Sequence, residues 1–313
     1  MDGLNQSTGP SLILVKTALD KLRDDATLQM ARTGKVEATD AVVFSQDTAN
    51  NAAVVTSVIG GGGYFDKTTD DLALRKQSSK KAAAPKTTII AEFDKNLQIA
   101  RTFMADQQQG AVGKAVSQAT KSWLASRDRN AISVYALGFG TTQNTTIDAV
   151  APFSNSHVNQ NGDTIDNLET GVLSEDNLNV LVNSLRTQIN QSGVKVGYEP
   201  DFLLTPSLIH RTGMAIAKSV LRQGTGNNDL NYWSEMYPGM KVVYSPFLDE
   251  VSTTAYFIGS MGHGIVRYER EAFFTTLVGW ETQQNNAYQY KMIAREEVDS
   301  IEYSGLAASN GTV

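Results

Sequence analysis

Cysteine is absent from the 313 residues of this chain. Its absence excludes disulfides, thiolate catalysis and every cysteine-ligated zinc or iron–sulfur site. No apolar run approaches the roughly 18 residues that a membrane-spanning helix requires. The first residues, Met1 to Gln6, lack the basic start and apolar stretch of a signal peptide. We therefore expect a soluble protein that is made inside the cell.

Charged residues are also scarce, at 19% of the chain, and their places are filled by Asn, Gln, Ser, Thr, Ala and Gly. This composition suits a surface that lies against other protein copies. The 27 lysine and arginine residues are outnumbered by 33 aspartate and glutamate residues, which gives a net charge of -6. Broad binding to nucleic-acid phosphates needs clustered cations, so the chain is a poor candidate for that class of protein.

Candidates for catalytic chemistry are few. The three histidines, His157, His210 and His263, stand far apart, and none has a second histidine or a carboxylate at metal-ligand spacing. We interpret each as a surface or hydrogen-bonded structural imidazole. The adjacent carboxylates Glu296 and Glu297 would point to opposite faces of a strand and so cannot share a site. The sequence predicts no catalytic residue, cofactor or metal, and we expect no enzyme activity.

A run of four glycines, Gly60, Gly61, Gly62 and Gly63, opens the second segment of the chain. It lacks the Lys-Ser/Thr ending of a phosphate-binding loop and leads into polar sequence rather than a helix. Four consecutive glycines lose too much backbone freedom to hold a helix or a strand. The run is therefore predicted to be a hinge.

The polar stretch beyond the glycines carries Lys80 and Lys81 and leads into two β-branched segments, 87–93 and 97–103. We interpret the whole as a long two-stranded arm, with the glycine hinge at its base and the lysines at its tip. Two interpretations of the lysines stay open: contact with an acidic neighbour, or charges that keep an exposed tip soluble. An isolated hairpin is marginal in water, so the arm needs something to lie on.

The rest of the chain has the pattern of an α+β protein without internal repeats. A short amphipathic helix is expected around Leu12–Leu22, and a long helix from Asp106 through Tyr135. Ser174 is expected to cap a further helix, and Thr205 with Pro206 to begin another. The expected strands are 202–204, 241–244, 256–259, 273–280, 288–293 and 298–303. Arms without a core of their own suit a protein that packs against copies of itself.

Several short phrases, in this order and spacing, resemble one family. They are Asp128–Ala131, Phe153–His157, Asn167–Leu168, Thr170–Gly171, Leu173–Ser174 with Asn177–Leu178, Leu203–Leu208, Val243–Leu248 and Asn285–Tyr290. Together they resemble the major capsid protein of tailed double-stranded DNA bacteriophages, the HK97-fold family. The resemblance covers about Gly60 to the C-terminus. Before Gly60 only the position of an N-terminal arm is similar.

The resemblance implies an HK97-like capsid fold in which each segment has a part. Residues 1–59 would form the N-terminal arm, and 60–104 the extended loop that overlaps a neighbouring subunit. Residues 105–140 and 271–313 would form a peripheral domain with a long spine helix, and 141–270 an inserted axial α/β domain. Gly60–Gly63 and Lys80–Lys81 then become candidates for a hinge and for inter-subunit contacts.

The implied function is that of a head protein that self-assembles into hexamers and pentamers. These would form the icosahedral shell of the virion around double-stranded DNA, after assembly in the bacterial cytoplasm. The implied partners are other copies of the chain, a portal and a scaffolding protein, with no sequence-specific DNA contact and no membrane. Two alternatives stay open: an encapsulin-like nanocompartment shell with an enzyme cargo, and an α+β hydrolase without a recognisable site.

Overall fold

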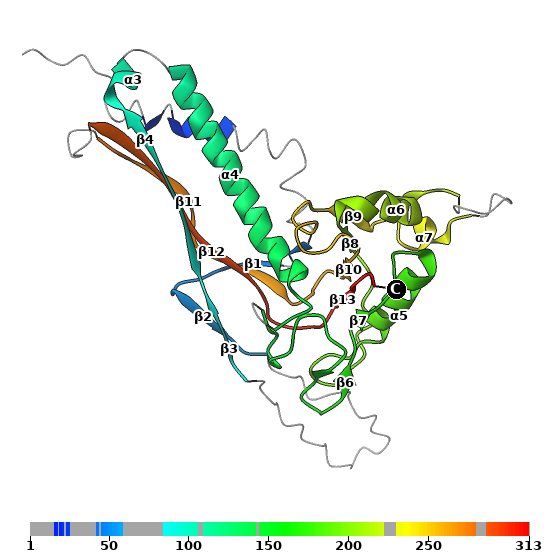
Figure 1. The fold of residues 1–313 in the computed structure, drawn as a ribbon. Coiled ribbons are helices and arrows are strands. Elements are labelled where there is room, and N and C mark those ends of the chain that lie inside the picture. Colours follow the sequence, from blue (N-terminus) through cyan, green and yellow to red (C-terminus); the bar gives the residue numbers. More distant parts are fainter. Residues whose placement is uncertain are drawn as a thin grey trace, which may run out of the picture. The chain divides into compact units, whose positions relative to one another are not determined.

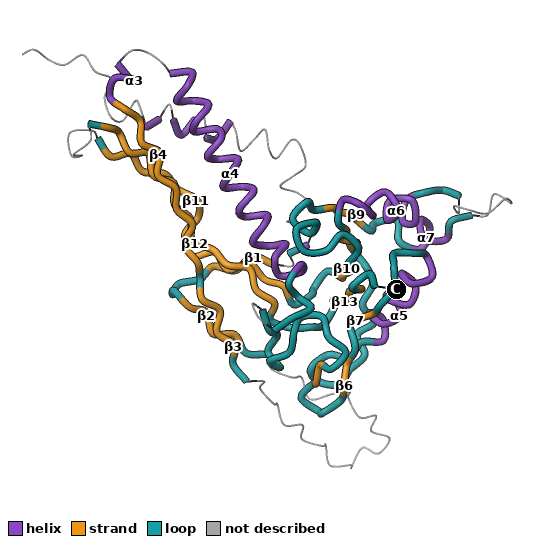
Figure 2. The backbone as a smooth tube through the Cα atoms, viewed as in Figure 1, coloured by secondary structure: helices purple, strands orange, loops and turns teal. Residues whose placement is uncertain are grey.

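The computed structural model describes residues 16–17, 19–21, 23–25, 42–43, 45–58, 84–105, 109–141, 144–221, 230–279 and 286–312. The chain divides into two compact units, and each contains both helices and strands (Figures 1 and 2). Unit one consists of residues 1–37, 90–128 and 269–296, and unit two of residues 38–89, 129–268 and 297–313. The predicted α+β class is confirmed. A helix with the length and apolar character of a membrane span does not occur among the described residues.

Unit one consists of long strands that pack against a helix. Its elements are β4 (Ala91–Ala100), α3 (Arg101–Ala105), α4 (Gln109–Ala136) as far as residue 128, and most of β11 (Ile265–Val278) and β12 (Ala287–Ser300). The β4 strand runs antiparallel to β12, from Ala100 opposite Ala287 to Ala91 opposite Glu296. A four-stranded sheet has the order β1-β11-β12-β4, in which β1 is Ser45–Thr48.

The long helix α4 packs in unit one through the stripe that its sequence predicts. Val112, Val116 and Ala119 are buried, four and three residues apart, with Tyr290 and Met292 of β12. Trp123 continues the stripe: its ring stacks on Phe273 at 5.3 Å between centroids. The helix runs without interruption to Ala136, and its residues Ala131, Ile132 and Tyr135 are buried in a core of unit two. The described residues between 16 and 25 are also helical, as predicted.

Unit two is built on a five-stranded sheet with the order β7-β13-β10-β8-β9. The strands are β7 (Leu168–Glu169), β13 (Leu306–Ser309), β10 (Tyr256–Gly259), β8 (Phe202–Thr205) and β9 (Lys241–Tyr244). Every residue of β8, β10 and β13 is buried, because both faces of the sheet are covered. Two short pairs complete the unit: β2 (Ala53–Thr56) with β3 (Lys86–Ile89), and β5 (His157–Val158) with β6 (Thr164–Ile165).

Three helices cover one face of this sheet: α5 (Glu175–Thr187), α6 (Ser207–Lys218) and α7 (Tyr232–Met236). The predicted stripe of α5 is confirmed, since Leu178, Leu181, Val182 and Leu185 are all buried. Ser174 caps α5 by accepting a hydrogen bond from the Asn177 main-chain N–H at 3.2 Å. The opposite face of the sheet carries Phe257 of β10 and is covered by aromatic side chains that include Tyr135 and Phe153.

Two expectations about local structure are wrong. Segments 87–93 and 97–103 do not pair with each other: β3 pairs with β2, and β4 pairs with β12. Strand β4 also ends at Ala100, and the helix α3 begins at the next residue, Arg101. At α6, Pro206 occupies the N-cap position, and the first free N–H, that of Ser207, is satisfied by the Asp249 carboxylate at 2.9 Å rather than by Thr205.

The last strand joins the sheet of unit two. β13 lies between β7 and β10, with Tyr256 opposite Ser309 and Ala308 opposite Leu168. Residues 269–296 belong to unit one, and residues 297–313 belong to unit two. The main chain at Glu302 passes very close to Gly264. A β-carbon at position 264 would overlap the main chain of Glu302, so only glycine fits there.

Candidate assembly site

The predicted hinge and tip residues, Gly60–Gly63 and Lys80–Lys81, lie outside the described residues. The structure describes the chain on both sides of them, as far as Val58 and again from Ala84. Strands β2 and β3 flank this interval and pair antiparallel, with Ala53 opposite Ile89 and Thr56 opposite Lys86. We call these two strands the loop root.

The β3 side of the loop root is fastened by a buried carboxylate. Lys86 Nζ lies 2.6 Å from Asp299 Oδ1 and also donates to the Ser300 carbonyl at 2.7 Å. The Thr88 hydroxyl donates to Asp299 Oδ2 at 2.6 Å. Both oxygens of Asp299 are thus used by one strand, with side-chain exposures of 14% for Lys86 and 8% for Asp299. A charged pair this sheltered from water holds β3 in one position on β12.

The β2 side is fastened by neutral groups. The Thr56 hydroxyl lies 2.9 Å from the Tyr268 hydroxyl, and Gln160 Nε2 donates to the Val58 carbonyl at 3.2 Å. Burial raises the pKa of Tyr268 above its ordinary value, so this phenol stays protonated and able to donate. Both sides of the interval 59–83 are therefore attached to unit two.

Sequence reasoning did not single out Lys86, Thr88 or Asp299. Lys86 and Asp299 are far apart in the chain, and nothing in either local pattern names the other. One weak signal was present: Asp299 stands in a segment otherwise predicted to be a strand, Val298 to Tyr303. An aspartate is disfavoured in such a strand, and one that is buried needs a partner.

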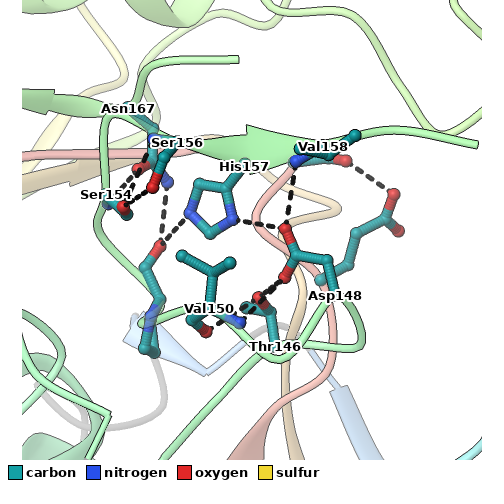
Figure 3. A network of polar contacts seen from close by, with 11 residues as sticks. Thr146, Asp148, Val150, Ser154, Ser156, His157, Val158 and Asn167 are labelled. Carbon is teal, nitrogen blue, oxygen red and sulfur yellow. Dashed lines mark hydrogen bonds and ion pairs between the residues drawn. The ribbon is translucent and has the colours of Figure 1, made fainter. Parts of the chain in front are cut away.

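His157 lies in a polar network of unit two (Figure 3). Its ring is fully buried and stacks on Tyr303, with centroids 4.7 Å apart. Nδ1 lies 2.9 Å from Asp148 Oδ2, and Nε2 lies 3.3 Å from the Pro152 carbonyl oxygen. Both ring nitrogens therefore face oxygen acceptors. This is the hydrogen-bonded structural imidazole that the sequence predicted, although its position is buried rather than on the surface.

Asp148 organises the loop around this histidine. Burial by itself raises the pKa of the Asp148 carboxyl, but hydrogen bonds from His157 and Thr146 outweigh it and hold the pKa below its ordinary value. The Val158 main-chain N–H adds a third donor at 3.3 Å. The hydroxyls of Ser154 and Ser156 lie 3.0 Å apart and share a hydrogen bond (Figure 3). The hydrogen bonds of Asp148 and His157 therefore hold the loop between these two residues in place.

The other two histidines stay separate from this network. His210 lies on α6, where its Nδ1 is 3.3 Å from the Thr205 hydroxyl, and burial lowers its pKa. His263 is 3% exposed, and its Nδ1 accepts from the Ile265 main-chain N–H at 3.2 Å. Burial lowers the pKa of His263 to about 3, so its ring is neutral at physiological pH.

The adjacent carboxylates of β12, Glu296 and Glu297, lie in different surroundings. Glu296 is 2% exposed and forms an ion pair with Arg127 at 3.2 Å, whereas Glu297 is half-buried. In the described part of the chain, no three histidine, cysteine, aspartate or glutamate side chains come together as a metal site would require. The described geometry is that of anchored loops and packed strands.

Comparison with known proteins decides the family. The model of the family described as "Phage capsid protein" matches residues 83–308, which is most of the chain and includes both units. The chain belongs to the phage capsid protein family. Its place is therefore in the capsid of a virion, as a major structural component of the shell, and the resemblance stated from the sequence is confirmed.

Solved structures share the fold of this capsid family member at low sequence identity. A chain from Microbacterium phage Oxtober96 is 12% identical, with a TM-score of 0.52 over 87% of this chain and 90% of that chain. A virus-like particle from Pyrococcus furiosus gives 11% identity and 0.53 over 93% and 98%. The capsid of a native GTA particle gives 14% identity and 0.51 over 89% and 91%. No curated protein matched by sequence.

Proposed function

We propose that this chain self-assembles into hexamers and pentamers, and that these form an icosahedral shell around double-stranded DNA. The observation that carries the proposal is the family match over residues 83–308, which makes the chain a capsid protein. Its net charge of -6 favours confinement of DNA without adhesion to it.

We further propose the parts played by each segment. Residues 1–59 act as an N-terminal arm, and 60–104 as an extended loop that overlaps a neighbouring subunit. Residues 105–140 and 271–313 form the peripheral domain with α4 as its spine, and 141–270 the axial domain. The loop root supports this assignment, because both sides of the interval 59–83 are anchored in unit two. The β3 side is held by a buried hydrogen bond and an ion pair, and the β2 side by a partly buried hydrogen bond. A loop that carries load between subunits needs such an anchor.

Gly60–Gly63 would then be the hinge on which the loop pivots as the shell changes size, and Lys80 and Lys81 would contact the neighbour. A scaffolding protein and a portal complete the proposed set of partners. The contents of purified particles test the proposal. Nuclease-protected double-stranded DNA is expected inside particles from infected cells, whereas a folded protein cargo without DNA would favour the nanocompartment alternative and contradict the proposal.

A further inference from the structure

β13 (Leu306–Ser309) is an inner strand of the five-stranded sheet of unit two, yet it follows every other described helix and strand in the chain. Within the described residues, β7 pairs with β13 alone, and β10 pairs with β13 on one side and with β8 on the other. Figure 1 shows β13, coloured red, beside β7 and β10. If β13 were missing, the sheet would therefore be divided between β7 and β10.

The residues of β13 complete two apolar cores, one on each face of the sheet. Leu306 and Ala308 are buried with Phe257 in the first core. Ala307 is buried with Leu181 of α5 in the second core. Neighbouring residues of a strand point to opposite faces, so one short strand contributes to both cores. Neither core is complete until β13 is in place.

A buried amide joins β13 to the end of α5. Gln188, the C-cap residue of α5, is 3% exposed. Its Nε2 donates to the Leu306 carbonyl at 2.7 Å, and its Oε1 accepts from the Gly305 main-chain N–H at 3.0 Å. Both partners of this side chain thus belong to β13 and to the residue before it. Without them the amide would be buried without hydrogen bonds, which is costly because water cannot replace them there.

The other end of β13 is joined to the chain around β7. The Ser309 hydroxyl donates to the Gly171 carbonyl at 2.8 Å. The Ala308 main-chain N–H donates to the Asn167 carbonyl at 2.9 Å. Asn167 is fully buried, and its Oδ1 accepts in turn from the Ser154 main-chain N–H at 2.8 Å. β13 therefore holds α5, the chain around β7 and β10 in one arrangement.

Without β13, the edge of β10 would be open. All four residues of β10, Tyr256–Gly259, are buried, and the main-chain N–H and C=O groups on this side would have no partner. An open edge beside apolar side chains readily accepts another extended segment. We call the gap between β7 and β10 the slot. It has the geometry to bind a strand with small or apolar side chains, as β13 has.

We propose that insertion of β13 into the slot is a checkpoint, which confines shell assembly to copies whose synthesis has passed β13. The inference rests on the proposed function, because it concerns when a copy becomes competent to assemble. Domains fold as units during synthesis, and unit two cannot close while residues 306–309 are still inside the ribosome. A nascent copy therefore keeps its slot open, lacks a complete unit two and does not enter a shell.

Ribosome-bound chains test when unit two closes. The full chain is followed by a linker and a stalling sequence. A short linker keeps residues 303–313 inside the exit tunnel, and a long linker releases them. Brief trypsin treatment should cleave unit two at least about tenfold faster in the short-linker chain, because its open form is more populated.

A peptide supplied from outside tests the slot itself. The peptide of residues 303–312, added to the short-linker chain, should restore trypsin resistance to within about threefold of the long-linker chain. The same peptide with Ala307→Asp is the matched control. It should restore no resistance, because its carboxylate would be buried in the second core.

A released full chain with Ala307→Asp tests the link between insertion and assembly. Its own β13 should fail to insert, so negative-stain micrographs should contain neither rings nor closed particles. Addition of the unaltered peptide, which can occupy the slot in place of the altered strand, should restore particles. This recovery distinguishes an open slot from a general failure to fold.

The outcomes separate the inference from the proposed function. Equal trypsin resistance with both linkers overturns the checkpoint, because unit two then closes without β13. Recovery with neither peptide, or with both peptides equally, overturns the assignment of the slot to β13. Normal assembly of the Ala307→Asp chain overturns the link between insertion and assembly. An unaltered released chain that resists trypsin but stays monomeric at every concentration contradicts the proposed shell function instead.

Discussion

Replacement of Asp299 by alanine should loosen the loop root. In the native chain Asp299 accepts from Lys86 at 2.6 Å and from the Thr88 hydroxyl at 2.6 Å, and its side chain is 8% exposed. Without the carboxylate, the Lys86 ammonium keeps only the Ser300 carbonyl, at 2.7 Å, inside a pocket that leaves 14% of its side chain exposed. The Thr88 hydroxyl loses its acceptor in a buried position.

The expected magnitude follows from burial. Removal of one partner from a buried ion pair costs about 3–5 kcal/mol, because the remaining charge is left uncompensated. Lys86 retains some solvent and one carbonyl, so Asp299→Ala should fall at the low end, at about 3 kcal/mol. The ion pair between Arg129 and Glu250 is a matched control: its distance of 2.7 Å is similar, but its side chains are 65% and 49% exposed. Glu250→Ala should therefore cost less than about 1 kcal/mol.

Urea unfolding measures the difference. Trp233 is 3% exposed in unit two and reports on that unit alone once Trp123 and Trp280 are replaced by phenylalanine. Addition of Lys86→Met to Asp299→Ala should recover part of the lost stability, because the unpaired ammonium is removed. Equal costs for Asp299→Ala and Glu250→Ala, or no recovery on removal of Lys86, would refute the reasoning that burial makes this anchor strong.

Three further predictions concern other parts of the chain. Gly264→Ala should lower the free energy of unfolding in urea by several kcal/mol, because the added β-carbon would overlap the main chain of Glu302. The control Gly239→Ala faces open space and should change the free energy of unfolding by less than about 1 kcal/mol. Equal effects of the two substitutions would contradict the packing described. Burial lowers the pKa of His263 to about 3, so between about pH 6.5 and pH 3 this histidine is protonated in the unfolded chain but not in the folded one. The free energy of unfolding should therefore fall as the pH drops through this range. His263→Gln should make the free energy of unfolding depend less on pH in the same range. Replacement of Gly61 and Gly62 by valine should impair shell assembly or expansion in electron micrographs, and unchanged shells would rule out a hinge there.

Local features of the fold could be predicted from the sequence. The stripe Leu178, Leu181, Val182 and Leu185 and the cap at Ser174 depend on residues within a few positions of one another, and both are confirmed. The α4 stripe through Val116 is confirmed for the same reason. The α+β class then follows from the mixture of such elements.

Strand partners and anchors could not be predicted in this way. Segments 87–93 and 97–103 alternate like two strands of a hairpin, yet β4 pairs with β12, nearly two hundred positions along the chain. A strand's alternation shows which side chains share a face but does not name its neighbour. The role of Asp299 could not be predicted for the same reason, because its partners Lys86 and Thr88 lie on a strand far from it in the chain.

The central claim is that this chain builds a closed shell from copies of itself. Negative-stain electron microscopy of the purified chain, with sedimentation of the same sample, tests it most directly. The account predicts closed particles, or rings of five and six subunits, that sediment far ahead of a single chain. A 33.9 kDa monomer at every protein and salt concentration would contradict it.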